Sequence, residues 1–351
     1  MLAITLQDLR YRWRQFIIAV VGAGLVFAMT LLLAGLAAGF SKEIDQTVQS
    51  VGAQSWVMAA GASGRLAAMP PIAQSNAALV ATEPGVHRAD PLIVIPQAAE
   101  IPGLTQAQSV NLVGAEPGGL GSVAPTIGHR VENDDQAVVD SVFDVHMGGS
   151  FAVAGHVFRV VGVVTNRTLL GGTPDVYVSI GAAQRAVCGG RALIDAIVTL
   201  GRPSTVPVGL QVLTNAQVES ASLHQMSSAV SSINNSKGFM WAIAAIIVAA
   251  LIYVTALERT RDFAVLKALG SSSRLLFAGL ATQAVAVTLI AAIVAAGISH
   301  FMTGLFAQPV AIPGSAFVVL PISAVIVGLV ASVAALRRAV SVDPAAAFAG
   351  A

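Results

Sequence analysis

The sequence has 351 residues, of which 55% are hydrophobic and 11% are charged. Because a soluble globular domain carries about 25% charged residues, this composition excludes an ordinary soluble protein. The single cysteine, Cys188, excludes an internal disulfide, and we expect it to act as a small buried hydrophobic residue. The formal net charge of +1 identifies no partner, because charges of opposite sign are concentrated in different segments.

The N-terminal stretch LQDLRYRWRQF has apolar residues at helical spacing with basic residues among them. This pattern predicts a short amphipathic helix within residues 1–15 that lies at the inner membrane surface. Basic residues that only orient the segment after them explain the pattern equally well. The candidate membrane-interface residues are Arg10, Arg12, Trp13 and Arg14.

Four long apolar runs, at 16–40, 238–257, 275–298 and 316–336, contain no charged residue. Each reaches the roughly 20 residues that a helix needs to cross a bilayer, so the sequence predicts four transmembrane helices. The first run is longer than the apolar core of a secretory signal peptide, about 7–15 residues. An uncleaved membrane anchor is therefore favoured over a cleavable leader.

The basic residues indicate the orientation of these spans. They precede the first run, occur within 258–274 and follow the last run, whereas segment 41–237 has ten basic and fourteen acidic residues. By the positive-inside rule, both termini and 258–274 are cytoplasmic and 41–237 is extracytoplasmic. The expected organisation is a cytoplasmic helix at 1–15, a span at 16–40, the external domain at 41–237, a span at 238–257, a cytoplasmic loop at 258–274, a span at 275–298, an external loop at 299–315, a span at 316–336 and a cytoplasmic tail at 337–351.

The external segment alternates short β-branched runs with turn signals, which is typical of a mixed domain. Strands are predicted in PLIVIP, SVNLVGAE, QAVVDSVF, GHVFRVVGVV, PDVYVSI and LIDAIVTL. Helices are predicted in SIGAAQRAV and over 215–233, with Asn215 as a candidate N-cap, and 41–58 is expected to continue the first helix. The predicted fold is an α-helical membrane protein with four transmembrane helices and a large extracytoplasmic α+β domain.

Common catalytic motifs are missing from the sequence. It contains no Gly-Lys-Ser/Thr phosphate loop, no HExxH and no GxSxG, so we expect no enzyme activity, no metal and no bound cofactor. The stretch VENDDQAVVD gathers four acids without the spacing of a calcium loop, and a solvated acidic turn is favoured. The glycine-rich stretch GAEPGGLGS is also expected to form a turn.

Residues 258–274, ERTRDFAVLKALGSSSR, concentrate six charges between two uncharged runs. Phe263, Leu266 and Leu269 form one apolar stripe of a predicted helix, and Gly270 suits its C-terminal cap. A plain connector that obeys the positive-inside rule accounts for the arginines alone. The apolar stripe and the Gly-Ser break favour a rigid element that docks onto another protein.

This loop resembles the hallmark loop of MacB/FtsX-type ABC transporter permeases, the type VII mechanotransmission family. The stretches VNLVGAEP, AVVDSVFDVHMGGSFAVAGHVFRVVGVV and DVYVSIGAAQRAV are similar to the MacB-like periplasmic core, and ALRRAVSVDPAAAF is similar to the family's C-terminal end. Together with the topology, the resemblance covers nearly the whole chain. Two departures are Asp262 in place of a usual glutamate and Gln283 where many relatives carry one.

The resemblance implies a permease subunit, a homodimer or a pseudo-dimer with a similar permease, that works with two copies of a separate ABC ATPase in the plasma membrane. ATP and Mg²⁺ would bind to that ATPase and not to this chain, and no nucleic acid would be involved. Conformational change in the external domain would then export or handle a lipid, lipoprotein, peptide or small molecule. The implied ATPase-coupling residues are Glu258, Arg259, Asp262, Phe263, Leu266, Lys267, Leu269 and Gly270.

Two other functions stay open at this point. A permease of an importer for amino acids or other polar nutrients also uses a cytoplasmic loop with a downstream glycine, but usually has five or six spans and no large external domain. A receptor or scaffold that does not transport would need a cytoplasmic signalling module, and the short cytoplasmic segments offer none.

Overall fold

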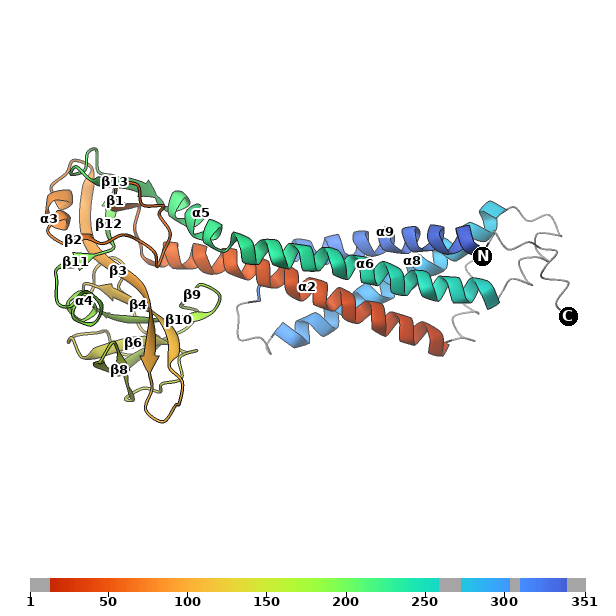
Figure 1. The fold of residues 1–351 in the computed structure, drawn as a ribbon, viewed down its shortest axis with the longest axis horizontal. Coiled ribbons are helices and arrows are strands. Elements are labelled where there is room, and N and C mark those ends of the chain that lie inside the picture. Colours follow the sequence, from red (N-terminus) through yellow and green to blue (C-terminus); the bar gives the residue numbers. More distant parts are fainter. Residues whose placement is uncertain (1–12, 259–272, 304–309, 340–351) are drawn as a thin grey trace. The chain divides into compact units, whose positions relative to one another are not determined.

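The computed structural model describes residues 13–258, 273–303 and 310–339 (Figure 1). The chain divides into two units, one formed by Phe40–Ser228 and the other by Met1–Gly39 with Ala229–Ala351. The first is called here the α/β unit and the second the helical unit. This combination of long apolar helices with a mixed domain confirms the predicted fold class.

Four long helices make up the described part of the helical unit. They are α2 (Trp13–Ser50, of which the residues up to Gly39 belong to this unit), α6 (Ser227–Glu258), α8 (Ser273–Met302) and α9 (Gly314–Ala339). Within the described residues, three segments are long and apolar enough to cross a membrane: Phe16–Ser50, Ser227–Val254 and Ala281–Met302. The corresponding apolar segment of α9, Gly314–Val330, is shorter.

Small residues allow these helices to pack closely, as they do in membrane bundles. Alanines from α2, α6, α8 and α9 share one buried cluster, which includes Ala23, Ala244, Ala291 and Ala324. The rings of Phe27 and Trp241 meet in the same region with centroids 5.4 Å apart. Large apolar side chains such as those of Ile18, Ile293, Phe301 and Val318 instead point outward and are exposed.

The α/β unit contains an 11-stranded mixed sheet in which the order of the main path is β13-β1-β12-β3-β4-β10-β6-β8-β5. The pairs β4–β10 and β6–β8 are parallel, and the other pairs are antiparallel. The strands are β1 (Ser55–Ala59), β2 (Ile72–Ala73), β3 (Val86–Glu100), β4 (Gln108–Ala115), β5 (Ile127–Gly128), β6 (Gln136–Asp140), β7 (Ser150–Val153), β8 (His156–Val164), β9 (Thr168–Leu169), β10 (Thr173–Ser179), β11 (Leu193–Ile194), β12 (Ala196–Gly201) and β13 (Leu210–Thr214); β2 and β11 form a separate two-stranded sheet.

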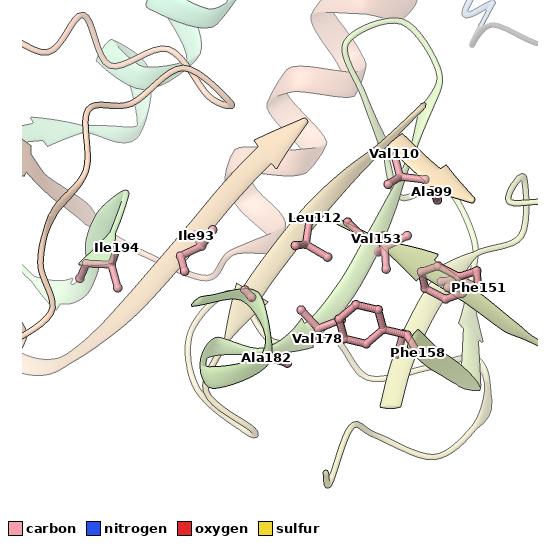
Figure 2. Close-up of a cluster of buried hydrophobic side chains, with 14 of the residues drawn as sticks. Ile93, Ala99, Val110, Leu112, Phe151, Val153, Phe158, Val178, Ala182 and Ile194 are labelled. Carbon is pink, nitrogen blue, oxygen red and sulfur yellow. The ribbon is translucent and has the colours of Figure 1, made fainter. Parts of the chain in front are cut away.

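Alternation along the strands buries both faces of the large sheet. On one face Val57, Ile93 and Leu112 join a cluster that includes residues of the short helices α3 (Asn76–Ala81) and α4 (Ile180–Cys188). Part of this cluster, including Phe151, Phe158 and Val178, is shown in Figure 2. On the other face, their sequence neighbours join a cluster with residues of α2 and of α5 (Asn215–Gln225).

Two predicted details are wrong. Helix α2 ends at Ser50 and does not continue to 58, because Trp56 and its neighbours are buried in β1 between β12 and β13. Thr214, and not Asn215, caps α5, since its hydroxyl accepts from the Gln217 amide in a capping box. Asn215 instead accepts a hydrogen bond from the Trp56 indole at 2.8 Å.

Candidate functional site

The two helices that flank the predicted docking loop are described up to its edges. Helix α6 ends at Glu258, whose side chain is exposed, and α8 begins at Ser273. Trp13 and Arg14 are the first residues of α2. The other predicted coupling and interface residues lie outside the described residues: Arg10, Arg12, Arg259, Asp262, Phe263, Leu266, Lys267, Leu269 and Gly270.

Gln283 on α8 is a buried polar residue whose side-chain amide nitrogen is unpaired, unlike the hydroxyls of other buried polar residues described in the helical unit. Its residue is 3% exposed, and its Nε2 has no hydrogen-bond partner. The hydroxyls of Thr288, Ser299 and Ser332, by contrast, donate to carbonyl oxygens of their own helices. An unpaired buried amide is energetically costly, so position 283 is occupied at a cost to stability.

In the α/β unit, the end of α2 contacts the β9–β10 hairpin, residues 167–175. Glu43 is buried, and its two carboxylate oxygens accept hydrogen bonds from the backbone amides of Gly171 and Gly172, each at 2.9 Å. One turn further along α2, the Thr47 hydroxyl lies 3.4 Å from the Thr168 carbonyl oxygen. The sequence analysis did not identify Glu43, because its partners are 128 and 129 residues away.

Behind the hairpin lies a group of buried polar residues on the central strands. Asp175 on β10 accepts from Asn111 at 3.2 Å and from Tyr177 at 3.3 Å. Burial raises the pKa of the Asp175 carboxyl to about 8, and the nearby carboxylates of Glu43 and Asp140 act in the same direction. Asp175 therefore holds a proton at neutral pH.

Asp140 corrects the prediction of a solvated acidic turn in VENDDQAVVD. It is fully buried, and its carboxylate accepts from the amides of Val142 and Arg167 at 2.9 and 2.7 Å. Asp134 in the same stretch accepts from Ser179 and forms an ion pair with Arg185, which together hold the pKa of the Asp134 carboxyl below its usual value. The spacing alone carried no signal for the burial of Asp140.

Comparison with known proteins identifies the class. The family model described as FtsX-like permease C-terminal matches residues 238–344. An uncharacterized ABC transporter permease of Mycobacterium tuberculosis is 39% identical over 350 residues, which is 100% of both chains, and a second one from the same species is 36% identical over the same length. The chain belongs to the FtsX-like ABC transporter permeases.

Two solved structures resemble part of this permease. The periplasmic region of MacB from Actinobacillus actinomycetemcomitans covers 50% of this chain and 96% of its own, with 13% identity and a TM-score of 0.36. The extracellular domain of the noncanonic ABC-type transporter YknZ, from Gram-positive bacteria, covers 46% of this chain and 99% of its own, with 12% identity and a TM-score of 0.34.

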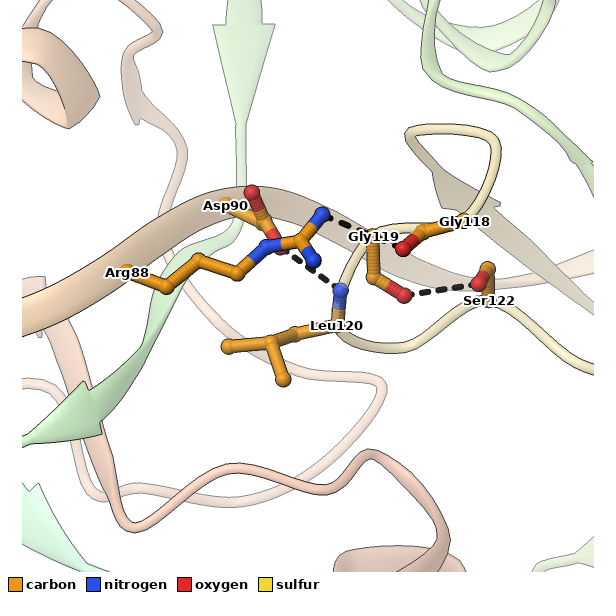
Figure 3. A network of polar contacts seen from close by, with 6 residues as sticks. All are labelled: Arg88, Asp90, Gly118, Gly119, Leu120 and Ser122. Carbon is orange, nitrogen blue, oxygen red and sulfur yellow. Dashed lines mark hydrogen bonds and ion pairs between the residues drawn. The ribbon is translucent and has the colours of Figure 1, made fainter.

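The glycine-rich stretch GAEPGGLGS forms a turn in the permease, as predicted. Asp90 accepts from the Leu120 amide at 2.6 Å and pairs with Arg88 at 2.6 Å. The Arg88 guanidinium also donates to the Gly118 carbonyl, and Ser122 donates to the carbonyl of Gly119 (Figure 3). The turn is thus held by side chains of β3 and of its own residues, which is a structural role.

An open groove of about 620 Å³ lies beside the β3–β4 turn of the permease. Glu100–Ala107 form one wall, and residues of β7 and β8, including the exposed Val157, form another. Within the described ranges, no group of three or more His, Cys, Asp or Glu side chains is placed to hold a metal ion.

Proposed function

We propose that the permease couples ATP hydrolysis by a separate ABC ATPase to conformational change in its α/β unit, outside the cytoplasm. The main supporting observation is α2, a single helix of 38 residues. At about 1.5 Å per residue such a helix is longer than the roughly 30 Å hydrocarbon core of a bilayer. Its last turns contact the β9–β10 hairpin, so the same helix contains an apolar segment and a contact with the hairpin.

The proposed membrane arrangement has four spans, made by α2, α6, α8 and α9, with both termini in the cytoplasm. Exposed apolar side chains on all four helices, such as Ile18, Ile246, Ile293 and Ile326, support contact with lipid. The distribution of basic residues supports the orientation. Two permeases, identical or similar, would assemble with two ATPase subunits, which bind ATP and Mg²⁺.

In this arrangement residues 258–274 form the contact with the ATPase. The segment contains both charged and apolar residues, which suits a groove on a protein partner. In the chain it lies between α6 and α8. The cargo classes that fit an external working unit are a lipid, a lipoprotein, a peptide or a small molecule. An importer of polar nutrients is disfavoured, because the permeases of such importers usually have five or six spans and no domain as large as the α/β unit.

The test is copurification with an ABC ATPase encoded beside the permease. Leu266→Asp places a charge in the apolar stripe, and Glu258→Arg reverses a charge at its start, so we expect each to weaken ATPase association at least about tenfold. The measurement is the amount of ATPase retained on the tagged permease, together with its hydrolysis rate. Leu104→Asp in the external groove is the matched control, because Leu104 is an exposed leucine of the α/β unit.

If Leu266→Asp and Glu258→Arg retain the ATPase as well as the wild type, residues 258–274 are not the ATPase contact. Membrane insertion of each variant is checked by extraction of washed membranes, so that loss of the permease is not mistaken for loss of binding.

A further inference from the structure

We propose that the Glu43 carboxylate is the contact through which α2 moves the β9–β10 hairpin, and with it the central strands of the external sheet. This inference rests on the proposed function, because it identifies where movement of a span enters the α/β unit. The junction consists of Phe40, Glu43 and Thr47 on α2 and of Thr168, Gly171 and Gly172 on the hairpin.

The backbone of the hairpin presents two amide groups to the Glu43 carboxylate. Gly171 and Gly172 have φ angles of 87° and 91°, and Leu170 before them has 59°. The two consecutive amides of this turn both face the Glu43 carboxylate and form a small anion-binding concavity. Each of the two amides donates to a different oxygen of Glu43, so the carboxylate is held in one orientation.

Close packing reinforces this contact. A Cβ atom added to Gly171 would lie 3.3 Å from the Phe40 ring, so the absence of a side chain lets α2 approach the loop. Leu170 adopts a left-handed backbone conformation, which is sterically unfavourable for a leucine. Leu169, Ile44 and Val48 belong to the same buried cluster, which means that helix and hairpin share one apolar core.

The hairpin leads directly into the centre of the sheet. Strand β10 is parallel to β4 on one side and antiparallel to β6 on the other. The Asn111 amide of β4 lies 3.3–3.4 Å from the carbonyl oxygens of Leu169 and Thr173, and Asp140 of β6 accepts from the Arg167 amide. Displacement of α2 along its axis would therefore reach two neighbouring strands through residues 167–175.

A carboxylate is a costly choice for a purely structural contact at this position. Glu43 is 4% exposed, and burial penalises the charged form of an acid unless hydrogen bonds compensate. In return, the two hydrogen bonds to Glu43 resist sliding in a way that apolar contacts do not, because they depend on direction. The pair is suited to transmitting displacement between α2 and the hairpin.

The first experiment measures hydrogen exchange of the full-length permease in nanodiscs, with fragmentation that resolves single amides. Glu43→Ala removes both acceptors and Glu43→Gln removes one, so we expect the Gly171 and Gly172 amides to exchange at least about tenfold faster in Glu43→Ala, with a smaller increase in Glu43→Gln. Unchanged protection of β4 and β12 shows that the variants fold. Asp45→Asn, the same charge loss two residues away, is the matched control and is expected to match the wild type.

Wild-type exchange rates at Gly171 and Gly172 in Glu43→Ala would overturn the proposal. A second experiment repeats the measurement in the complex with the ATPase, with and without vanadate-trapped nucleotide. We expect nucleotide to change exchange in both α2 and residues 167–175 of the wild type, but only in α2 of Glu43→Ala.

The outcomes separate this inference from the proposed function. If α2 responds to nucleotide while residues 167–175 respond equally in Glu43→Ala and wild type, the role of Glu43 in transmission is refuted and the proposed function stands. If neither α2 nor the hairpin responds in the wild type, the proposed coupling by ATP is refuted, whereas the first experiment still decides whether Glu43 holds the hairpin.

Discussion

Buried acids in the α/β unit are held in two different ways. Glu43 and Asp140 each accept two backbone amide hydrogen bonds. Asp175 lacks such amides, and burial raises the pKa of its carboxyl to about 8. Asp175 therefore carries a proton at neutral pH.

The raised pKa of Asp175 predicts that the α/β unit becomes less stable as the pH rises. The folded state binds the Asp175 proton more tightly than the unfolded state, whose pKa is near 3.8. The stabilisation is therefore complete below pH 3.8 and is lost as the pH rises to about 8, at up to about 1.4 kcal/mol per pH unit. Asp175→Asn should remove this slope and raise the stability at pH 8 above that of the wild type.

The measurement is urea unfolding of the permease between pH 6 and 8, followed by the fluorescence of Trp56 after Trp13 and Trp241 are replaced by Phe. Trp56 is fully buried in the α/β unit, so it reports that unit. Asp195→Asn is the control: burial raises the pKa of the Asp195 carboxyl to about 6, so its contribution falls mainly below this window. An equal slope in Asp175→Asn and wild type would contradict the assignment.

At the scale of elements, close approach of α8 and α9 depends on a glycine. A Cβ atom added to Gly328 would lie 3.0 Å from the Thr288 hydroxyl and 3.2 Å from the Ala284 carbonyl oxygen, which belong to the neighbouring helix. Gly328→Val should separate the two helices and lower stability by about 1–3 kcal/mol. Gly297 on α8 has no atom within 4 Å of the corresponding position, so Gly297→Val is the matched control.

Thermal unfolding in detergent, measured by circular dichroism, checks this prediction. The midpoint of Gly328→Val is expected several degrees below that of Gly297→Val. Equal midpoints for the two variants would show that α8 and α9 do not require close contact at Gly328.

The elements that could be predicted from sequence are those with a strong local pattern. GHVFRVVGVV became β8, with burial that alternates along most of the strand, and SIGAAQRAV became α4 with Ser179 as its cap. The end of α2 could not be predicted, because burial of Trp56 depends on pairing of β1 with β12 and β13, more than 140 residues away. The Thr214 cap was missed because Asn215 has an equally good capping side chain, which Trp56 engages instead.

At the scale of the whole molecule, the charge distribution predicts which segments face the cytoplasm. In a Cys188→Ser background, a cysteine at Thr105 in the α/β unit should react with a membrane-impermeant maleimide in intact cells. A cysteine at Ser272, in the 258–274 segment, should react only after the membrane is permeabilised. The reverse pattern of labelling would contradict the orientation.

Replacement of the natural thiol matters for this measurement. Cys188 is the single cysteine of the chain, and burial raises the pKa of its thiol, which slows but does not prevent labelling. The Cys188→Ser protein without a new cysteine should show no labelling on either side.

The sequence predicted the site only as far as local motifs extend. The family was identifiable from the loop ERTRDFAVLKALGSSSR together with the topology, because both are contiguous patterns. The contact between Glu43 and the hairpin was not, since an acid on a helix and a Gly-Gly pair are each common and become meaningful only when the fold brings them together. The available signal was weak: Glu43 lies beside Ile44 in a stretch with apolar residues at helical spacing.

The pairing of Glu43 with Gly171 and Gly172 also restricts how this protein can vary over evolutionary time. An aspartate at 43 would be one methylene too short to reach both amides, and a side chain at 171 would displace Phe40. We therefore expect related permeases to retain these three residues together or to lose them together, although 127 residues of sequence separate Glu43 from the first of the two glycines.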